Sequence, residues 1–478
     1  MQDALTFPES GDSLREMSNF ACSNYRSVLS RRDAIKVGGL GLLGFAMPDI
    51  LRAETLPRKF KVRAKSVIFL FQWGGPSHLD MFDMKPDAPE GIRGPYKPMA
   101  TKADGIQISE KLPLTAKVMN KVTLIRSVHH TMNNHNSAGY YALTGHAPAT
   151  DDQRLRDSLD LFPGFSSVVD RFAPGGKEMP TAVSFPHTIS DGSVTPGQHA
   201  SFLGRRHDPL LILQDPNAAS FALPELSLPS DIPIERMHAR RELQQLVDQQ
   251  ARLMDISAAA RGMDGYYEKA MSMLQSPRLR DAFNIGAEPG NVRDAYGRTT
   301  YGQSCLLARR LVEAGSKFAT VYFSDTIGGQ KTVSGGWDTH GFNNTRMFPI
   351  VEKRHLPITE QTLPTLLNDL EDRGMLDETL VVWMGEFGRT PSINKNVSRD
   401  HWPFCYTVLL AGGGVKRGYV HGSSDKTGSY PASDPVRPDD IAATIFAALG
   451  IDPHTEVTKA DGRLSFLSDG NPISEIFA

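Results

Sequence analysis

The chain has 478 residues, of which 40% are hydrophobic and 22% are charged. This composition is typical of a folded globular protein, and the length suits one large α/β domain or two smaller ones. The formal net charge of -2 gives no reason to expect nucleic acid or an anionic membrane surface as a partner.

The first 53 residues have the pattern of a targeting segment. The run SRRDAIK at 30–36 resembles the twin-arginine export motif, from which it departs at Ala34. The Gly-rich apolar run at 37–47 is too short to span a bilayer stably and suits a signal peptide. The alternative is a chance Arg-Arg pair beside a core helix. We expect residues 1–53 to be a twin-arginine signal that directs the protein, through the twin-arginine machinery, to the periplasm or cell surface, without a stable membrane span.

Predicted strands and helices alternate along the rest of the chain. Apolar, β-branched runs predict strands, and apolar residues at helical spacing with Gly or Pro at the ends predict helices. In chain order the elements are strand 65–71, helix 112–119, strand 122–128, helix 137–144, helix 301–314, strand 317–323, helix 355–373, strand 379–384, strand 406–411 and helix 439–449. This alternation predicts an α/β fold with a largely parallel sheet. We expect one domain over 54–478, with a helical insertion at about 225–300.

Polar residues follow four of the predicted strands. The carboxyl ends of strands are where open α/β sheets bind ligands, so these residues are expected to meet. Mixed carboxylate and imidazole groups suit a divalent metal such as Zn or Mn, and Ca or Mg where carboxylates dominate. The residues concerned are Asp80, Asp83, His129, His130, His135, Asp325, Asp338, His340, Glu386, Asp400 and His401.

Each of these groups also has a structural interpretation. A single histidine is at least as often hydrogen-bonded in a core as bound to metal, and no local zinc signature such as H-E-x-x-H is present. A functional role is favoured for His340 and His401, which lie close to an Asp on turn-rich loops. Arg389 and Arg399 could bind an anion, or form salt bridges to Glu386 or Asp400. Of the cysteines, Cys305 and Cys405 are expected to be buried thiols rather than a disulfide.

Several longer motifs resemble a known superfamily. The segment 356–451 resembles the C-terminal part of sulfatases and other alkaline-phosphatase superfamily enzymes. A closer resemblance is to an exported, sulfatase-like family of unknown function with a twin-arginine leader. The matching motifs are G-G-P-S-H-x-D-x-F-D-x-K-P at 74–86, W-D-x-H at 337–340, G-E-F-G-R-T-P at 385–391 and R-D-H at 399–401. The resemblance implies a three-layer sandwich, with a mostly parallel central sheet and helices on both faces.

The resemblance implies a metal-dependent hydrolase of sulfate or phosphate esters, acting on a small-molecule or polysaccharide anionic ester. The implied ligands of Zn, Ca, Mn or Mg are Asp338, His340, Glu386 and His401, with Asp80, Asp83 and His135 as second choices. Arg389 or Arg399 would hold the anionic oxygens and His129 would be a general acid. Ser77, Thr131 and Ser137 are candidate nucleophiles by position only, and a metal-bound water would need none of them.

Two departures from the superfamily pattern leave a second interpretation open. His135 stands where sulfatases carry a modified cysteine, and Phe387 replaces the histidine of the metal-binding D-H-G. We therefore expect a single-metal or rearranged site. The alternative is a catalytically altered member that acts as an exported ligand-binding or surface protein.

Overall fold

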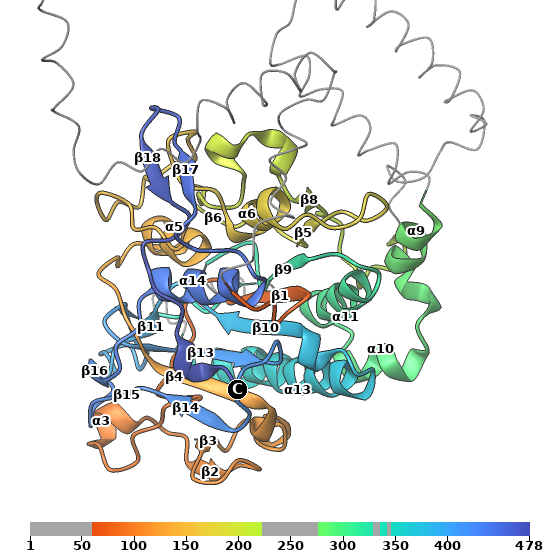
Figure 1. Cartoon of the computed structure of the whole chain (residues 1–478). Coiled ribbons are helices and arrows are strands. Elements are labelled where there is room, and N and C mark those ends of the chain that lie inside the picture. Colours follow the sequence, from red (N-terminus) through yellow and green to blue (C-terminus); the bar gives the residue numbers. More distant parts are fainter. Residues whose placement is uncertain (1–59, 222–275, 328–334, 342–345) are drawn as a thin grey trace, which may run out of the picture. The chain divides into compact units, whose positions relative to one another are not determined.

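An eight-stranded sheet lies at the centre of the fold, in the order β14-β4-β13-β10-β1-β9-β5-β8 (Figure 1). Its side chains form nearly continuous apolar runs because both faces are covered. The strands are β1 (Ser66–Phe71), β4 (Val122–Val128), β5 (Ala182–Phe185), β8 (Leu210–Leu211), β9 (Phe318–Tyr322), β10 (Thr379–Met384), β13 (Tyr406–Ala411) and β14 (Tyr419–His421).

The strands of this sheet are parallel except β13, which runs antiparallel to both β10 and β4. The ends of β1, β9 and β10 are level, since Phe71 pairs with Tyr322 on one side and Met384 on the other. The start of β13 reaches the same edge, where Tyr406 pairs with Val128 at the end of β4. We call this the carboxyl edge, because β1, β4, β9 and β10 all end there.

Helices cover both faces of the sheet, which makes a three-layer arrangement. Successive strand residues point to opposite faces. Ile68 and Leu70 of β1 pack with α11 (Thr300–Glu313) and α13 (Leu356–Asp372). Val67 and Phe69 belong to a second core, with α5 (His135–Thr144), α6 (Phe165–Phe172) and α14 (Pro438–Ala448). Figure 1 shows α14 and α13 on opposite sides of β10.

The remaining elements are short. They include the helices α3 (Glu90–Arg93), α4 (Pro113–Ala116), α9 (Pro277–Phe283), α10 (Gly290–Tyr296) and α12 (Met347–Ile350). The small paired strands are β2 (Pro98–Ala100) with β3 (Gln107–Ser109), β6 (Ser190–Asp191) with β7 (Ser193–Val194), β11 (Gly388–Arg389) with β12 (His401–Trp402), β15 (Ser423–Ser424) with β16 (Pro431–Ser433), and β17 (Glu456–Thr458) with β18 (Leu464–Phe466).

The α/β fold class with a mostly parallel sheet is confirmed, and the five predicted strands are present. Three of them, at 122–128, 379–384 and 406–411, have the predicted bounds. The helix predicted at 112–119 is shorter, because α4 gives way to a 3-10 turn at Met119–Lys121. Cys305 and Cys405 are buried free thiols, as expected.

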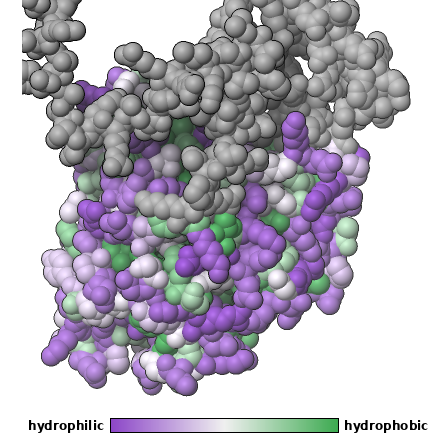
Figure 2. Space-filling view, viewed as in Figure 1, coloured by the Kyte–Doolittle hydropathy of each residue, from purple (hydrophilic) through white to green (hydrophobic). Residues whose placement is uncertain are grey.

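The computed structural model describes residues 60–221, 276–327, 335–341 and 346–478. The expected signal segment at 1–53 and most of the expected helical insertion at 225–300 lie outside these ranges. Within them, no helix has the length and apolar character needed to cross a bilayer. Polar side chains predominate on the face shown in Figure 2, with hydrophobic ones in small patches.

Candidate metal site at the carboxyl edge

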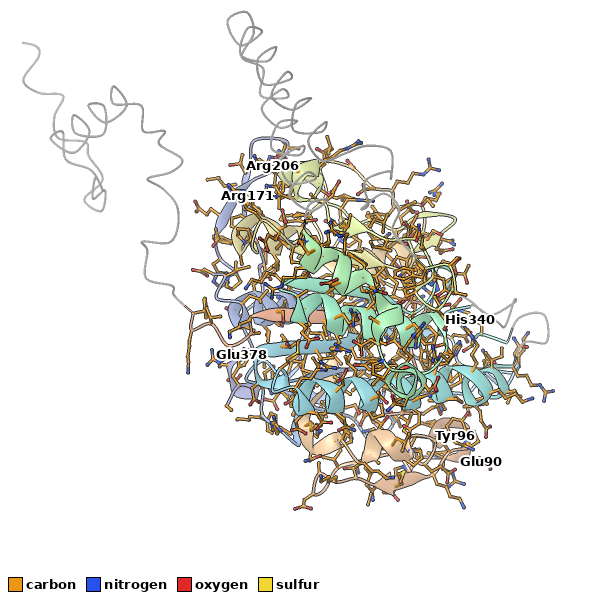
Figure 3. The ribbon with its side chains drawn as sticks, turned by 90° about the vertical axis from the view of Figure 1, so that its right-hand side faces the viewer. Glu90, Tyr96, Arg171, Arg206, His340 and Glu378 are labelled. Atoms are coloured by element: carbon orange, nitrogen blue, oxygen red, sulfur yellow. The ribbon has the colours of Figure 1, made fainter. Side chains whose placement is uncertain are left out.

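Four side chains from three distant segments meet at the carboxyl edge. His135 is the first residue of α5, which follows β4. Asp338 and His340 lie in the loop after β9, and His401 lies on β12 before β13. Figure 3 places His340 on the opposite side of the fold from Glu378, the residue just before β10 begins. We call His135, Asp338, His340 and His401 the histidine-aspartate cluster.

The carboxylate of Asp338 is the common contact of the cluster. Its Oδ1 lies 2.7 Å from His340 Nε2 and 3.0 Å from His401 Nε2. Its Oδ2 lies 3.4 Å from His135 Nε2. The Nε2 atoms of His340 and His401 are themselves only 2.9 Å apart. Three imidazoles therefore direct the same ring nitrogen toward one carboxylate.

The other ring nitrogen of each imidazole is bound to an oxygen. The pairs, each at 2.8 Å, are His135 Nδ1 with Glu386 Oε1, His340 Nδ1 with Asp400 Oδ1, and His401 Nδ1 with Asn133 O. Since carboxylates and carbonyls accept hydrogen bonds, the Nδ1 atoms donate. An imidazole that donates from Nδ1 can present its lone pair at Nε2, and an oxygen partner of this kind is the usual support of a metal-binding histidine.

A tight turn after β1 fixes the backbone at Asp338. Trp337 N donates to Trp73 O over 2.8 Å, and Asp338 N donates to Ile327 O over 2.8 Å. Gly74 in this turn has a φ of +104°, and a Cβ atom there would lie 2.4 Å from Asp338 N. Only glycine permits both this backbone conformation and this approach. The Gly-rich turn therefore determines where the Asp338 carboxylate lies.

Arg389 holds both the turn and the carboxylate. Its side chain is 1% exposed, and its Nη2 donates to Asp338 Oδ1 over 2.7 Å. The same guanidinium donates to Gly75 O over 2.9 Å and to Trp337 O over 3.2 Å. A salt bridge was expected as the alternative for Arg389, but with Glu386 or Asp400 as the acid; the acid is Asp338. The guanidinium N–H groups of Arg389 thus donate to groups within the protein.

Burial and close charges set the protonation of the cluster. Burial opposes ionisation of Asp338, but Arg389 and the three imidazoles outweigh it and hold its pKa well below the usual value. Burial also opposes a charge on His135, yet Asp338 and Glu386 raise its pKa to about 9. Burial lowers the pKa of His401 to about 4. Without a bound metal, the cluster at neutral pH thus contains an ionised Asp338, a protonated His135 and a neutral His401 that can accept at Nε2.

Residues 64–477 match the family described as "Protein of unknown function (DUF1501)". The chain belongs to this family. The expectation of a family of unknown function is confirmed, while the expected twin-arginine leader lies outside the described residues. No curated protein matches this DUF1501 chain.

Solved structures that the DUF1501 chain resembles share little sequence with it. One is the PsFucS1 sulfatase from Pseudoalteromonas sp., at 14% identity and a TM-score of 0.37, covering 81% of this chain and 68% of that one. Another is the phosphonate monoester hydrolase SpPMH from Silicibacter pomeroyi, at 12% identity and 0.37, covering 87% and 76%. A mutant of the alkaline phosphatase PafA has 10% identity and a TM-score of 0.40, and the match covers 87% of this chain and all of that one (100%).

Glu386 of the DUF1501 chain lies behind His135 and has no exposed surface. Its Oε1 accepts from His135 Nδ1 and, over 2.9 Å, from Gly74 N. Burial raises the pKa of Glu386, although the adjacent His135 opposes this shift. The ring of the neighbouring Phe387 packs on the cluster, with its centroid 4.3 Å from that of His401 and 5.0 Å from that of His135. Glu386 therefore supports the His135 ring, and Phe387 covers one side of the histidine-aspartate cluster.

Three other predicted site residues form a separate buried group. Arg399 Nε lies 2.8 Å from Asp80 Oδ2, and Ser77 Oγ donates to the same oxygen over 2.5 Å. Each of the three is at most 5% exposed. Arg399 and the Ser77 hydroxyl are thus both occupied by Asp80.

Asp83 and His129 also have partners outside the histidine-aspartate cluster. Lys85 Nζ lies 2.9 Å from Asp83 Oδ1, and Arg126 Nε lies 3.6 Å from the same oxygen. His129 follows β4, and burial together with the nearby Arg437 lowers its pKa. Asp400 and the carbonyl of Asn133 were not among the predicted metal ligands. The sequence placed Asp400 among the polar residues expected to meet, but nothing in it indicated a contact with His340.

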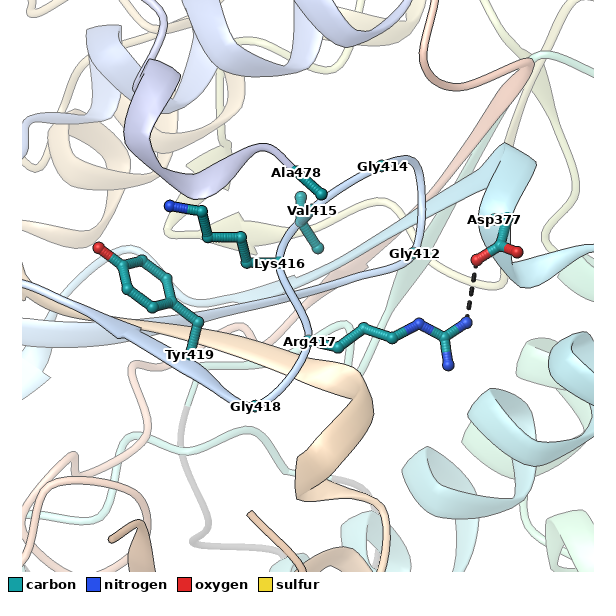
Figure 4. Close-up of a pocket in the computed structure, with 9 residues that line it drawn as sticks. All are labelled: Asp377, Gly412, Gly414, Val415, Lys416, Arg417, Gly418, Tyr419 and Ala478. Carbon is teal, nitrogen blue, oxygen red and sulfur yellow. Dashed lines mark hydrogen bonds and ion pairs between the residues drawn. The ribbon is translucent and has the colours of Figure 1, made fainter. Parts of the chain in front are cut away.

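A pocket of about 460 Å³ lies at the opposite end of β13 (Figure 4). It is lined by Gly412, Gly414 and Arg417, and the last of these is ion-paired to Asp377 at 2.9 Å and to Glu371 at 2.7 Å. The charge of Arg417 is therefore balanced by these two carboxylates.

Proposed function

We propose that the histidine-aspartate cluster holds one divalent metal ion and that the protein is a metal-dependent hydrolase of sulfate or phosphate esters. The observation that carries this proposal is the convergence of three Nε2 atoms on Asp338 while each Nδ1 is bound to an oxygen. His135 Nε2 is also buried, and it lies 3.4 Å from Asp338 Oδ2 without meeting hydrogen-bond geometry. A buried polar atom of this kind is costly unless something binds it, and a metal would do so.

The types of donor atom limit which metals suit the site. Three imidazole nitrogens and one carboxylate suit Zn, Mn or Fe, whereas Ca and Mg prefer shells of oxygen. Three imidazoles around the single Asp338 carboxylate support one metal rather than two. A divalent ion held there would polarise the ester and lower the pKa of a bound water.

The residues around the cluster indicate from which side a substrate would reach it. Phe387 packs against His135 and His401 and keeps water from that direction. Asp400 has a side chain that is 50% exposed, so the ester would approach from its side. Water would add to sulfur or phosphorus, and the bond to the alcohol oxygen would break. This route needs no serine nucleophile, which agrees with the engagement of Ser77 by Asp80.

The proposed ligand set is smaller than the one the sequence indicated. We leave out Asp80 and Asp83 because cationic side chains already bind them. We place Glu386 behind His135 as its supporting carboxylate rather than as a ligand. Arg389 orients Asp338, and Arg399 supports the loop that carries His401. No side chain is assigned as general acid, since His129 has no contact with the cluster in the described structure.

Metal analysis of the purified protein is the direct test. We expect about one equivalent of metal in the wild type, and its loss in Asp338→Asn and in His401→Ala. His454→Ala is the matched control, since His454 Nε2 is bonded to Gly470 O, away from the cluster. A folded wild type that stays metal-free after incubation with Zn and Mn would refute the proposal.

Turnover separates the enzyme from the alternative, an exported ligand-binding protein. Metal-loaded wild type is assayed with aryl sulfate, phosphate monoester and phosphate diester substrates. Hydrolysis that disappears in Asp338→Asn supports the enzyme. Stoichiometric metal with no hydrolysis of any ester class would favour the binding protein.

The export proposal rests on the sequence alone. We propose that residues 1–53 direct the protein through the twin-arginine pathway and that 54–478 form the mature domain, with an insertion at about 225–300. Replacing Arg31 and Arg32 by lysine should retain a fused reporter inside the cell. Export that is unaffected by both substitutions would contradict the assignment.

A further inference from the structure

Three aromatic side chains form a partly exposed group near the histidine-aspartate cluster. Their ring centroids are 4.9 Å apart for Trp402 and Phe404, 5.8 Å for Trp402 and Tyr430, and 6.0 Å for Phe404 and Tyr430. Phe404 is 36% exposed and Tyr430 is 52% exposed. We call Trp402, Phe404 and Tyr430 the aromatic platform. Exposing apolar rings to water has a cost that binding of a ligand would relieve.

The loop beside the platform is fixed in position. Trp402 Nε1 donates to Ser429 O over 2.6 Å. The carboxylate of Asp425 accepts from the backbone N–H of Thr427, Ser429 and Tyr430 at 2.9, 2.9 and 3.2 Å. These bonds hold the loop between β15 and β16 in one conformation. Rings held in this way lose little freedom when a ligand binds.

Gly428 brings the same loop against the body of the protein. Its φ is +71°, and a Cβ atom there would lie 2.7 Å from Leu79 Cδ2. Its carbonyl lies 2.9 Å from His78 Nε2, a nitrogen of a buried side chain. The loop therefore rests on the turn that follows β1.

The platform lies beside the histidine-aspartate cluster and on the same edge. Trp402 follows His401 on β12, and the two pair with Gly388 and Arg389 of β11. Neighbouring residues on a strand point to opposite faces, so the rings lie next to the cluster and not over it. Figure 1 shows β11, β15 and β16 together at the end of the sheet where β10 terminates. A ligand that touches both must be extended.

The size of the platform decides the kind of ligand. With about 200 Å² for a full aromatic side chain, the exposed parts of Phe404 and Tyr430 offer roughly 180 Å². A stable protein partner needs about 800 Å² on each side. Hydroxyl groups lie on the loop that carries Tyr430, where Thr427 Oγ1 is 2.7 Å from Ser429 Oγ, and on the strands that flank this loop, where Ser423 Oγ is 3.0 Å from Ser433 Oγ. Flat apolar rings with hydroxyl groups around them match one face and the edge of a sugar ring.

We propose that the aromatic platform stacks on a pyranose ring of a saccharide chain, and that this chain carries the ester presented to the histidine-aspartate cluster. The second half of the statement rests on the proposed function. Lys426 lies on the same loop, and its charge would favour a chain that bears sulfate or another anion.

The test is the migration of the full-length protein in native gels that contain dextran, dextran sulfate or carboxymethyl cellulose. The variants are the double substitution Phe404→Ala with Tyr430→Ala, and the control Phe466→Ala, an aromatic residue that is 40% exposed on β18. We expect at least one polysaccharide to retard the wild type and Phe466→Ala. The double variant should bind about tenfold more weakly, since each of the two lost stacking contacts is worth around a factor of three.

Two results would contradict the proposal that the aromatic platform binds a saccharide. One is wild-type migration that none of the three polysaccharides changes. The other is retardation by dextran sulfate that the double variant retains, because such binding would be ionic. The gels are repeated with EDTA, where retardation by the ester-free polymers dextran and carboxymethyl cellulose should persist because the aromatic rings need no metal. Retardation without hydrolysis of any ester would refute the proposed hydrolase and support saccharide binding by the platform. Hydrolysis of a small aryl ester without retardation would support the hydrolase and refute saccharide binding.

Discussion

Arg399 and Asp80 form a two-point ion pair in the interior of the protein. Arg399 Nε lies 2.8 Å from Asp80 Oδ2, and Arg399 Nη2 lies 3.0 Å from Asp80 Oδ1. The two residues are 0% and 1% exposed. Arg399 also donates to Thr390 O over 3.0 Å and to Ile92 O over 2.8 Å. The pair therefore joins the segment after β1 to the loop that carries His401.

Removing the acid of this pair should destabilise the fold. Asp80→Ala leaves a buried guanidinium without its counter-charge, and the expected loss is about 3–5 kcal/mol in the free energy of unfolding. Denaturant unfolding measures it. Asp87→Ala, at an exposed position nearby, should change stability by no more than about 0.5 kcal/mol. A loss at Asp80 no larger than at Asp87 would mean that the pair contributes nothing.

Asp400 should affect the metal affinity of the proposed site without affecting folding. Its carboxylate accepts from His340 Nδ1, and its side chain is 50% exposed. Asp400→Ala removes the support of that ring, and loss of such a partner typically weakens metal binding by about 10–100-fold. Isothermal titration with zinc measures the affinity. Asp377→Ala, whose side chain is 83% exposed and pairs with Arg417, serves as the matched control and should bind zinc like the wild type.

Added metal should stabilise the wild type against heat. A ligand at a hundred times its dissociation constant contributes about 2.7 kcal/mol when it binds only the folded state. Thermal unfolding with and without zinc detects this as a rise in Tm. His135→Ala removes one proposed donor and should reduce the shift strongly. An equal shift in wild type and His135→Ala would place the zinc elsewhere on the protein.

Glu288 should make stability depend on pH in the acid range. Burial opposes its charge, but Arg309 at 2.7 Å and Arg310 outweigh this effect and lower the pKa of the carboxyl. A carboxyl with a lowered folded pKa stabilises the protein above its unfolded pKa of about 4.3, and this contribution disappears as pH falls through the folded value. Glu288→Gln should therefore be less stable than wild type at pH 7.

The measurement for Glu288 is urea unfolding at several pH values between 7 and 3. The difference between wild type and Glu288→Gln should shrink steadily below about pH 4. Glu475→Gln is the control, since Glu475 is exposed near the end of the chain. A difference that stays constant down to pH 3 would show that the charge of Glu288 is not what stabilises the fold.

The strands could be predicted from the sequence because they are buried on both faces. Runs such as 379–384 and 406–411 are apolar throughout, so their bounds follow from composition alone. The direction of β13 could not be predicted in the same way. A strand buried on both sides has the same composition in either direction, and only its partners β10 and β4 determine it.

Which side chains meet at the carboxyl edge was predicted better than what each of the other candidates contacts. Strand ends placed His135, Asp338, His340 and His401 among the candidates, and the structure brings them together. Composition could not separate a carboxylate that faces the cluster from one that faces a buried cation, as Asp80 does. Ion pairs between residues so far apart in the chain depend on the whole fold. The residue types alone do not indicate which acid pairs with which base.

The reversed strand β13 has a further consequence for how the family can vary. Because β10 ends and β13 begins at the same edge, residues 385–405 leave the sheet and re-enter it without crossing to the other side. This connection carries Arg389, Arg399, His401 and two rings of the aromatic platform. Its length can change without shifting the register of any strand of the central sheet, because loops tolerate insertions that strands do not. New recognition surfaces can thus arise around an unchanged histidine-aspartate cluster.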